Sequence, residues 1–291
     1  MATTAEQRPK ERTTAGAPRR RLRLFGLLLP SVGWMVVVYL GSLLVLFLAS
    51  FWRLDPFTGL VVHDWGLQNF TKIFTESVYL VTAGRTLLMA IAVTLTDIAL
   101  ALPIAYYAAR MATPRARAVV LLAVVLPLWS SYLVRVFAWR VILSTQGLLS
   151  WLFFGKVHVG FSLWALWITF TYLWLPFVIL PIYASLERIP PSLIEASGDL
   201  GAGGWQTFRR VIWPMAIPGI VAGSIFSFSL TLGDYIAPTL VSNTQFIGNI
   251  VYQNTGVSGN FPFAAAYALV PVVIVGAYLL IARRLGAFEA L

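Results

Sequence analysis

Acidic side chains inside apolar stretches are the residues best placed to do chemistry in this chain. Asp234 lies in "TLGDYIAP", after a long uncharged stretch that begins at Val211, and it is flanked by Gly233 and Pro238. An ionisable residue in a membrane segment is costly and generally faces a cavity or a partner. A carboxylate there suits the ammonium groups of a cationic solute, which it would bind through charge-assisted hydrogen bonds. The alternative is that Asp234 caps a helix or pairs with an arginine.

Asp97 is the second acidic candidate, in "LTDIAL" with Thr94 and Thr96 beside it. It could line the same path, or it could pair with Arg135 or Arg140 inside a helix bundle. Pairing is the preferred alternative, because an unpartnered charge within a membrane is costly. The two arginines would repel a cation, so we expect them to orient their helix near the outer interface.

Aromatic side chains could add cation–π faces to such a path. Aromatic residues also form the belts at membrane interfaces and fill cores, and that simpler interpretation is favoured for each of them. The candidates are Trp129, Trp139, Tyr132 and Tyr235.

The sequence shows no residue pattern that indicates an enzyme's catalytic site. The chain has no cysteine, and His63 and His158 are too far apart in sequence to indicate a metal cluster. The pair Gly155–Lys156 lacks the remaining residues of a phosphate-binding loop, so the chain cannot hydrolyse ATP by itself. We expect no catalytic residue, no metal site and no cofactor of its own.

The composition indicates that the candidate residues described above belong to a membrane protein. Of 291 residues 59% are hydrophobic and 11% are charged, whereas about a quarter of the residues in a soluble domain are charged. About twenty apolar residues cross a bilayer as a helix. The predicted fold is therefore an all-α membrane protein with six spans, at about 24–52, 84–109, 118–142, 159–186, 211–240 and 264–282.

The basic residues predict the orientation of this bundle. Residues 1–23 form a basic tail without apolar periodicity, which we expect to be disordered, and residues 24–291 form the membrane domain. Most of the 21 Lys and Arg residues lie in this tail, in the loops after the second and fourth spans, and after the last span. The positive-inside rule then predicts that both termini and residues 190–210 are cytoplasmic. Because topology accounts for the basic excess, a nucleic-acid partner is not expected.

Residues 190–210 interrupt the apolar pattern with a short polar segment. Ser192 and Glu195 match a capping box that would start a helix at Leu193. Gly201 stands where a helix can end in a left-handed conformation, and Gly203–Gly204 permit a bend before "WQTFRR". The pattern predicts a rigid pair of short helices joined to the fifth span, with an apolar side that docks on a partner. An amphipathic helix resting on lipid is the alternative.

The stretch "EASGDLGAGGWQTFRRVIWPMAIP" resembles the EAA motif of permease subunits in bacterial ABC importers. Glu195, Ala196, Gly201 and Pro214 match at the expected spacing, while Ser197, Val211 and Trp213 depart from it. The resemblance implies that this segment is the coupling helix, which inserts into a cleft of a separate ATP-binding subunit. The implied coupling residues are Glu195, Ala196, Ser197, Gly198, Leu200, Gly201, Ala202, Phe208 and Pro214.

Four further segments resemble the spermidine/putrescine-type branch of these permeases, so the similarity covers about residues 69–285. They are "RTLLMAIAVTLTDIALALPIAYYAAR", "LPLWSSYLVRVFAW", "LPIYASLERIP" and "TLGDYIAPTLV". The resemblance implies a type I importer fold in a bacterial inner membrane and a second, similar permease chain. It also implies two ATP-binding subunits that hold ATP and magnesium, and an extracytoplasmic solute-binding protein. The expected substrate path includes Asp234, Tyr235, Asp97, Trp129 and Trp139.

Two alternatives remain open at this point. An importer of the same class could carry an aminophosphonate, 4-aminobutyrate, ferric iron or an oxyanion instead of a polyamine. A protein of another class, an ion-gradient-driven transporter or a channel, would also need several spans and membrane acids.

Overall fold

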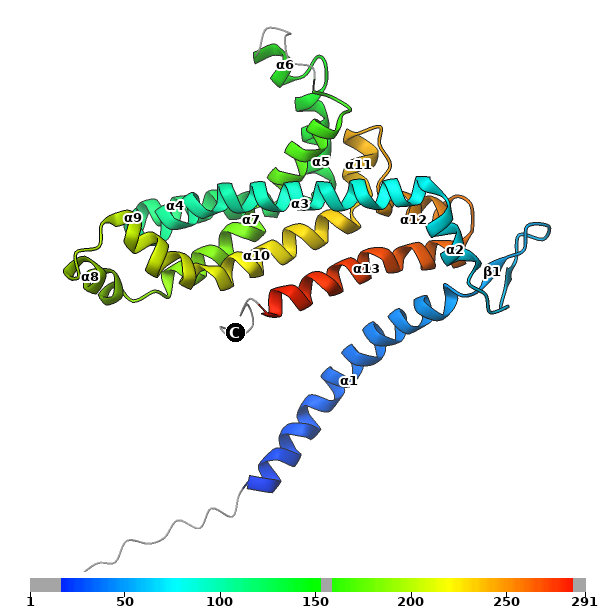
Figure 1. Cartoon of the computed structure of the whole chain (residues 1–291), viewed down its shortest axis with the longest axis horizontal. Helices are drawn as coiled ribbons and strands as arrows, with labels where there is room; N and C mark the ends of the chain where they lie inside the picture. The colour runs from blue at the N-terminus through cyan, green and yellow to red at the C-terminus, as the bar shows by residue number, and fades with distance from the viewer. Residues whose placement is uncertain (1–16, 153–158, 285–291) are drawn as a thin grey trace, which may run out of the picture. The chain divides into compact units, whose positions relative to one another are not determined.

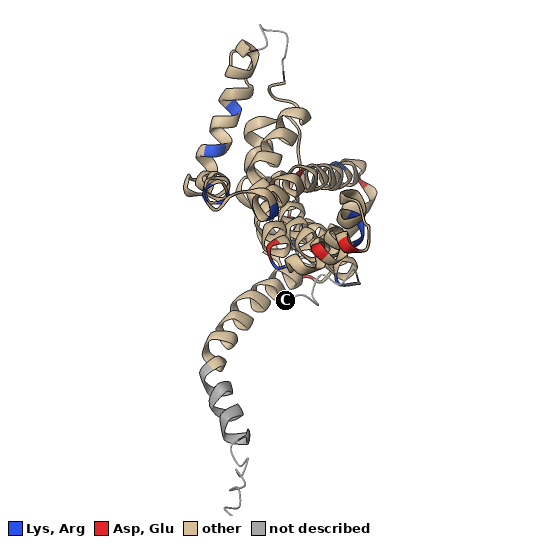
Figure 2. Ribbon diagram, turned by 90° about the vertical axis from the view of Figure 1, so that its left-hand side faces the viewer, with Lys and Arg blue, Asp and Glu red and all other residues tan. Residues whose placement is uncertain are grey.

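The structure, a computed structural model, describes residues 17–152 and 159–284, which are mostly helical (Figure 1). The chain divides into two units, Met1–Leu48 and Ala49–Leu291. Charged residues occupy short stretches of a ribbon that is otherwise uncharged (Figure 2). This distribution leaves long apolar helices between the charged stretches.

The first unit contains a single described helix, α1 (Ala17–Ala49). It begins at Ala17, inside the segment predicted as the tail, and residues 1–16 lie outside the described residues. The part Leu28–Ala49 is apolar and long enough to cross a membrane. Its 22 residues span about 33 Å, which matches the thickness of a bilayer core.

The second unit begins with a small hairpin and a short helix. Strand β1 (Arg53–Leu54) pairs antiparallel with β2 (Val61–Val62), and Arg53 is opposite Val62. Helix α2 (Gln68–Thr75) follows. The Asn69 amide donates to the carbonyls of Ser50 and Trp52 at 2.9 and 2.8 Å, which fixes the hairpin to α2.

Four long apolar helices form the body of this unit. Helix α3 (Ser77–Tyr106) continues as the π-helix η1 (Tyr107–Met111), and it begins several residues before the predicted span 84–109. Helix α7 (Leu163–Glu187) lies in the predicted span 159–186 and packs against both α3 and α10 (Trp213–Gly233) (Figure 1). Helix α13 (Phe261–Arg284) packs on α10 and corresponds to the predicted span 264–282.

Two predicted spans differ from the structure. The stretch 118–142 is divided into α4 (Pro114–Val125), the 3₁₀ turn η2 (Leu126–Trp129) and α5 (Tyr132–Leu143), which α6 (Leu148–Leu152) follows. The helical segments on the two sides of the break differ in direction by 98°. Pro127 has no amide hydrogen to donate, and the Ser130 hydroxyl donates to the Pro127 carbonyl at 2.7 Å. The described residues therefore contain five candidate spans, or six if the bent pair is one span.

The predicted span 211–240 is the second one that differs. Its helix ends at Gly233, and Asp234 is extended before the short helix α11 (Ile236–Val241) begins. Helix α12 (Ile247–Gly256) follows, in an amide-rich stretch between α11 and α13.

Glycines allow α7 and α10 to approach closely. A Cβ on Gly223 would lie 2.9 Å from the Cα of Val178, and one on Gly219 would lie 2.6 Å from the carbonyl oxygen of Pro181. Small residues four apart allow such close backbone contact between membrane helices. The Ser185 hydroxyl adds a hydrogen bond to the Met215 carbonyl at 2.9 Å. The two helices thus pack with their backbones in close contact.

Candidate functional site

Residues 190–210 form two short helices whose surface is mainly exposed. Helix α8 (Pro191–Asp199) begins with Pro191 at its first position, where a proline suits a helix. Its N-cap residue is Pro190, and no side chain caps it. The predicted capping box of Ser192 and Glu195 is therefore wrong, because the helix starts earlier and Ser192 lies within its first turn.

The end of α8 confirms the left-handed conformation predicted for Gly201. This residue has a φ of +78°, a conformation that favours glycine. The amide of Ala202 donates to the Ser197 carbonyl at 3.0 Å, and that of Gly201 donates to the Gly198 carbonyl at 2.8 Å. These two bonds form the Schellman motif, which fixes the direction in which the chain leaves the helix.

Helix α9 (Gly204–Thr207) continues through the π-helix η3 (Phe208–Ile212) into α10. The hydroxyls of Ser197 and Thr207 are 2.9 Å apart and join α8 to α9. The Gly203 amide donates to the Gln206 side chain at 3.3 Å. A force on α8 would therefore reach α10 without passing through a loose linker.

The predicted coupling residues divide between an exposed surface and an inner contact. Leu200 is 88% exposed, and Leu193 is partly exposed. Phe208 instead faces inward: it stacks on Trp205 at 5.6 Å and meets the edge of Tyr106 at 6.2 Å between ring centroids. Ile194 also packs against the protein's own core, so only part of the predicted apolar side is free to dock. The other exposed members are Glu195, Ala196, Gly198, Gly201 and Pro214, while Ser197 and Ala202 are half-buried.

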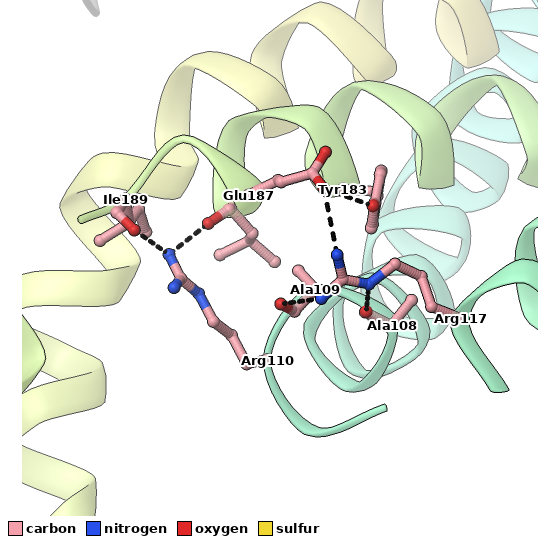
Figure 3. Close-up of polar contacts among 8 residues, drawn as sticks. Ala108, Ala109, Arg110, Arg117, Tyr183, Glu187 and Ile189 are labelled. Carbon is pink, nitrogen blue, oxygen red and sulfur yellow. Dashed lines mark hydrogen bonds and ion pairs between the residues drawn. The ribbon is translucent and has the colours of Figure 1, made fainter. Parts of the chain in front are cut away.

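Two arginines fix the end of α7 that leads into α8 (Figure 3). Arg110 donates to the carbonyls of Leu186 and Ile189, at 2.5 and 2.6 Å. Arg117 donates to the Ala108 carbonyl at 3.0 Å and forms an ion pair with Glu187 at 3.3 Å.

The sequence pattern did not predict this network, because membrane topology already accounts for both arginines. Arg110 binds carbonyls at the end of α7, more than 70 residues away in sequence, and no local pattern indicates such bonds. The network therefore connects η1 and α4 to the base of the exposed helices.

A pocket of about 370 Å³ lies where Asp234 follows α10, near the lower end of the usual range for ligand pockets. Its lining includes residues of α5, α7 and the end of α10, which the fold brings together from distant parts of the sequence. They include Tyr132, Trp174, Ser229, Gly233, Asp234 and Tyr235.

The Asp234 carboxylate is both a helix cap and part of this pocket. One oxygen accepts from the amides of Ile236 and Ala237, at 2.7 and 3.2 Å, and so caps α11. The other accepts from the hydroxyl of Tyr132. The Tyr132 ring stacks on Trp174 at 5.9 Å between centroids. The cap that the sequence offered as an alternative is present, and it leaves the acidic group in the pocket lining.

Among the described residues, Asp97 does not form the ion pair that was its preferred alternative. It is fully buried between α3 and α10, where one oxygen accepts from the Ser227 hydroxyl at 2.6 Å and the other has no partner among the described residues. The preferred pairing with Arg135 or Arg140 is wrong: the described ion pairs are Arg53–Asp64 and Arg117–Glu187. The Arg140 guanidinium lies over the Phe161 ring at 5.5 Å instead.

The aromatic candidates differ in their position relative to the pocket. Tyr235 lines the pocket and stacks on Tyr252 at 4.6 Å between centroids. Trp139 packs on Tyr172 at 5.1 Å in the core, and Trp129 is 79% exposed at the end of η2. Neither tryptophan lines this pocket, whereas Trp174, which the sequence did not single out, does.

Comparison with known proteins gives consistent matches along the chain. A family model described as "Binding-protein-dependent transport system inner membrane component" matches residues 16–288. The inner membrane ABC transporter permease protein YdcU of Escherichia coli K12 is 45% identical over 93% of this chain and 92% of its own length. The spermidine/putrescine transport system permease protein PotB of the same strain is 30% identical over 87% of this chain and 94% of its own length.

The fold is also found among solved structures. A bacterial alginate ABC transporter, in complex with an alginate pentasaccharide-bound periplasmic protein, contains a chain that superposes with a TM-score of 0.73. The match covers 91% of this chain and 93% of that one, at 18% identity. At this identity the likeness concerns the fold.

Proposed function

Because the chain belongs to the family of binding-protein-dependent transport system inner membrane components, we propose how this ABC importer permease performs its task. It forms, together with a second and similar permease chain, the translocation path for a small cationic solute. A polyamine such as spermidine or putrescine is the first candidate, because PotB is similar over most of this chain. The exposed pair α8–α9 receives the movement of ATP-binding subunits, which hold the ATP and magnesium that this non-catalytic chain does not use.

The observation that carries this proposal is the construction of residues 190–210. Their outward side chains include Glu195 and Leu200, while Phe208 and Ser197 face inward and hold the segment together. The segment then continues as helix into α10, which packs through Gly219 and Gly223 on α7. An exposed surface on a stiff, directly connected support suits the transmission of force from a partner.

The proposed coupling role also sets the orientation in the membrane and the side on which the solute-binding protein docks. Both termini and α8–α9 face the cytoplasm, in agreement with the positions of the basic residues. The hairpin β1–β2 and α12 face the opposite side, where a solute-binding protein delivers the cargo. The alginate transporter of similar fold was solved in complex with a periplasmic protein that carries an alginate pentasaccharide, which supports the expectation.

The path passes the pocket that contains Asp234 and Tyr235. Stacked aromatic faces and a carboxylate are suited to an ammonium group. Trp129, Trp139 and Asp97 were also proposed for the path; the first two lie outside this pocket, and Asp97 is enclosed between helices. In the present arrangement Asp234 and Tyr235 are therefore the stronger candidates.

Association with the ATP-binding subunit tests the coupling role. Glu195→Ala and Gly201→Val should reduce the amount of ATPase subunit that is captured with the tagged permease, and should reduce transport with it. Glu76→Gln removes an exposed carboxylate far along the sequence and serves as the control. Unchanged capture and unchanged transport in both coupling variants would reject the assignment.

The two alternative functions predict different experimental results. A secondary transporter or channel would move solute when the purified chain is reconstituted alone, with an ion gradient and no ATPase. An importer for another solute would show normal coupling, and its binding protein would be stabilised by an aminophosphonate, 4-aminobutyrate, ferric iron or an oxyanion rather than by a polyamine.

A further inference from the structure

A second cavity lies apart from the Asp234 pocket, between the beginning of α3 and the beginning of α7. It has a volume of about 760 Å³, which leaves room for a ligand larger than a small solute. We call it the α3–α7 groove. Its walls are apolar apart from one arginine, and they include Arg85, Leu88, Met89, Ala92, Trp164 and Trp167.

The groove lies along the early part of α3, at the level of Arg85. No charged residue follows Arg85 in α3 until Asp97. The lining runs from Val81 to Ala92, which is about 16 Å along a helix, and one leaflet of a bilayer core is about 15 Å thick. Trp164 is 67% exposed beside it, and tryptophan is enriched at the boundary between head groups and hydrocarbon. The groove therefore extends from the head-group level into one leaflet.

The charge of Arg85 is not neutralised within the described chain. Its guanidinium donates to the backbone carbonyl of Gln245 at 3.3 Å, and a carbonyl carries no net charge. The two described ion pairs, Arg53–Asp64 and Arg117–Glu187, leave it without a carboxylate. Trp167 adds a buried indole N–H that has no acceptor among the described residues. The lining of the apolar groove thus contains one cation without a carboxylate and one indole N–H without an acceptor among the described residues.

We infer that the α3–α7 groove binds an anionic phospholipid, with the phosphate at Arg85 and an acyl chain along Leu88, Met89 and Ala92. A phospholipid has an anionic head group joined to a long apolar chain. The groove has a cation, Arg85, next to an apolar wall, so both parts of the lipid would meet a complementary surface. A transmembrane helix of another chain would have to place an acidic residue at this one level. The inference is independent of the cargo and of the coupling role, since it requires only that α3 spans the membrane.

Native mass spectrometry of the permease, purified with its partner subunits, tests this inference. Dioleoyl phosphatidylglycerol is added to the complex, and dioleoyl phosphatidylethanolamine is the comparison lipid. We expect phosphatidylglycerol to be retained preferentially, and Arg85→Gln to lower its affinity about tenfold, because a charge-assisted bond is lost. Arg140→Gln is the matched control, since Arg140 also lacks a carboxylate among the described residues but lies over Phe161 outside the groove.

A second pair of variants tests the groove by its volume. A Cβ on Gly84 meets no atom within 4 Å, so Gly84→Leu extends into the groove with the backbone unchanged. Gly276→Leu in α13 is the control, because its Cβ is equally unobstructed. Gly84→Leu should displace the lipid, and Gly276→Leu should leave it bound.

Three results would overturn the inference. The first is retention of phosphatidylglycerol that is the same in wild type, Arg85→Gln and Gly84→Leu. The second is equal retention of the two lipids by the wild-type complex. The third is loss of the second permease chain from the Gly84→Leu complex with bound lipid unchanged, which would identify the groove as a protein interface.

Discussion

The hydroxyl oxygens of Ser197 and Thr207 lie 2.9 Å apart, and this contact closes the bend between α8 and α9. Together with the left-handed Gly201 it makes the exposed segment a single body that continues into α10. A partner that moves α8 would consequently move α10, and α7 with it.

Thr207→Val tests whether that closure matters for coupling. Thr207 is buried and valine has nearly its shape, so the main change is loss of one hydrogen bond, which contributes about 1 kcal/mol. The variant should still bind the ATP-binding subunit but move less solute for each ATP hydrolysed. The ratio of the two rates in proteoliposomes measures this, and an unchanged ratio would show that the contact is dispensable.

Gly223→Leu should separate α7 from α10. Its Cβ would lie 2.9 Å from the Cα of Val178, which is backbone and cannot rotate away. Overpacking of this kind costs about 1–3 kcal/mol. Thermal unfolding in detergent should show a lower midpoint for Gly223→Leu than for the control Gly276→Leu, whose Cβ is unobstructed. Equal midpoints would contradict the close approach of these helices.

Arg110→Gln should loosen the base of α8. The guanidinium serves two carbonyls at the end of α7, and hydrogen bonds that involve a charged group contribute about 1.5–3 kcal/mol each. Hydrogen exchange should rise across residues 186–200 in this variant. Arg115→Gln, at the exposed start of α4, is the control; a similar rise in both variants would assign the effect to charge alone.

Asp234→Asn separates the two tasks of this residue. The asparagine side-chain oxygen can still accept from the amides of Ile236 and Ala237, so the cap of α11 remains while the negative charge is lost. Transport of a cationic solute should fall about tenfold, as one charge-assisted bond predicts. Asp234→Ala loses the cap as well and should also lower the unfolding midpoint. Normal transport by Asp234→Asn would remove the carboxylate from the path.

The long apolar helices and the Gly201 turn were predictable because each depends on a local pattern. Apolar length defines α7 and α13, and a glycine after a short helical pattern defines the Schellman end of α8. The failures have other causes. The break after Pro127 depends on local turn chemistry inside an apolar run, which hydropathy does not report.

The partners of Asp97 and Asp234 depended on tertiary packing. Asp97 bonds to Ser227 and Asp234 to Tyr132, each more than 100 residues away in sequence. Coulomb pairing had suggested an arginine for Asp97, but a hydroxyl on an adjacent helix supplies its hydrogen bond instead. Trp174 was missed for a similar reason, since its place in the pocket depends on how α5 packs against α7.

Site-specific labelling of the naturally cysteine-free chain tests the central claim most directly. Leu200→Cys introduces one thiol on the exposed end of α8, and Phe57→Cys introduces one at the hairpin tip, where Phe57 is 97% exposed. Leu200→Cys should react with a membrane-impermeant maleimide only from the cytoplasmic side and should crosslink to the ATP-binding subunit. Phe57→Cys should react only from outside. Labelling of Leu200→Cys from outside, or a thiol that never crosslinks to that subunit in the assembled complex, would contradict the account.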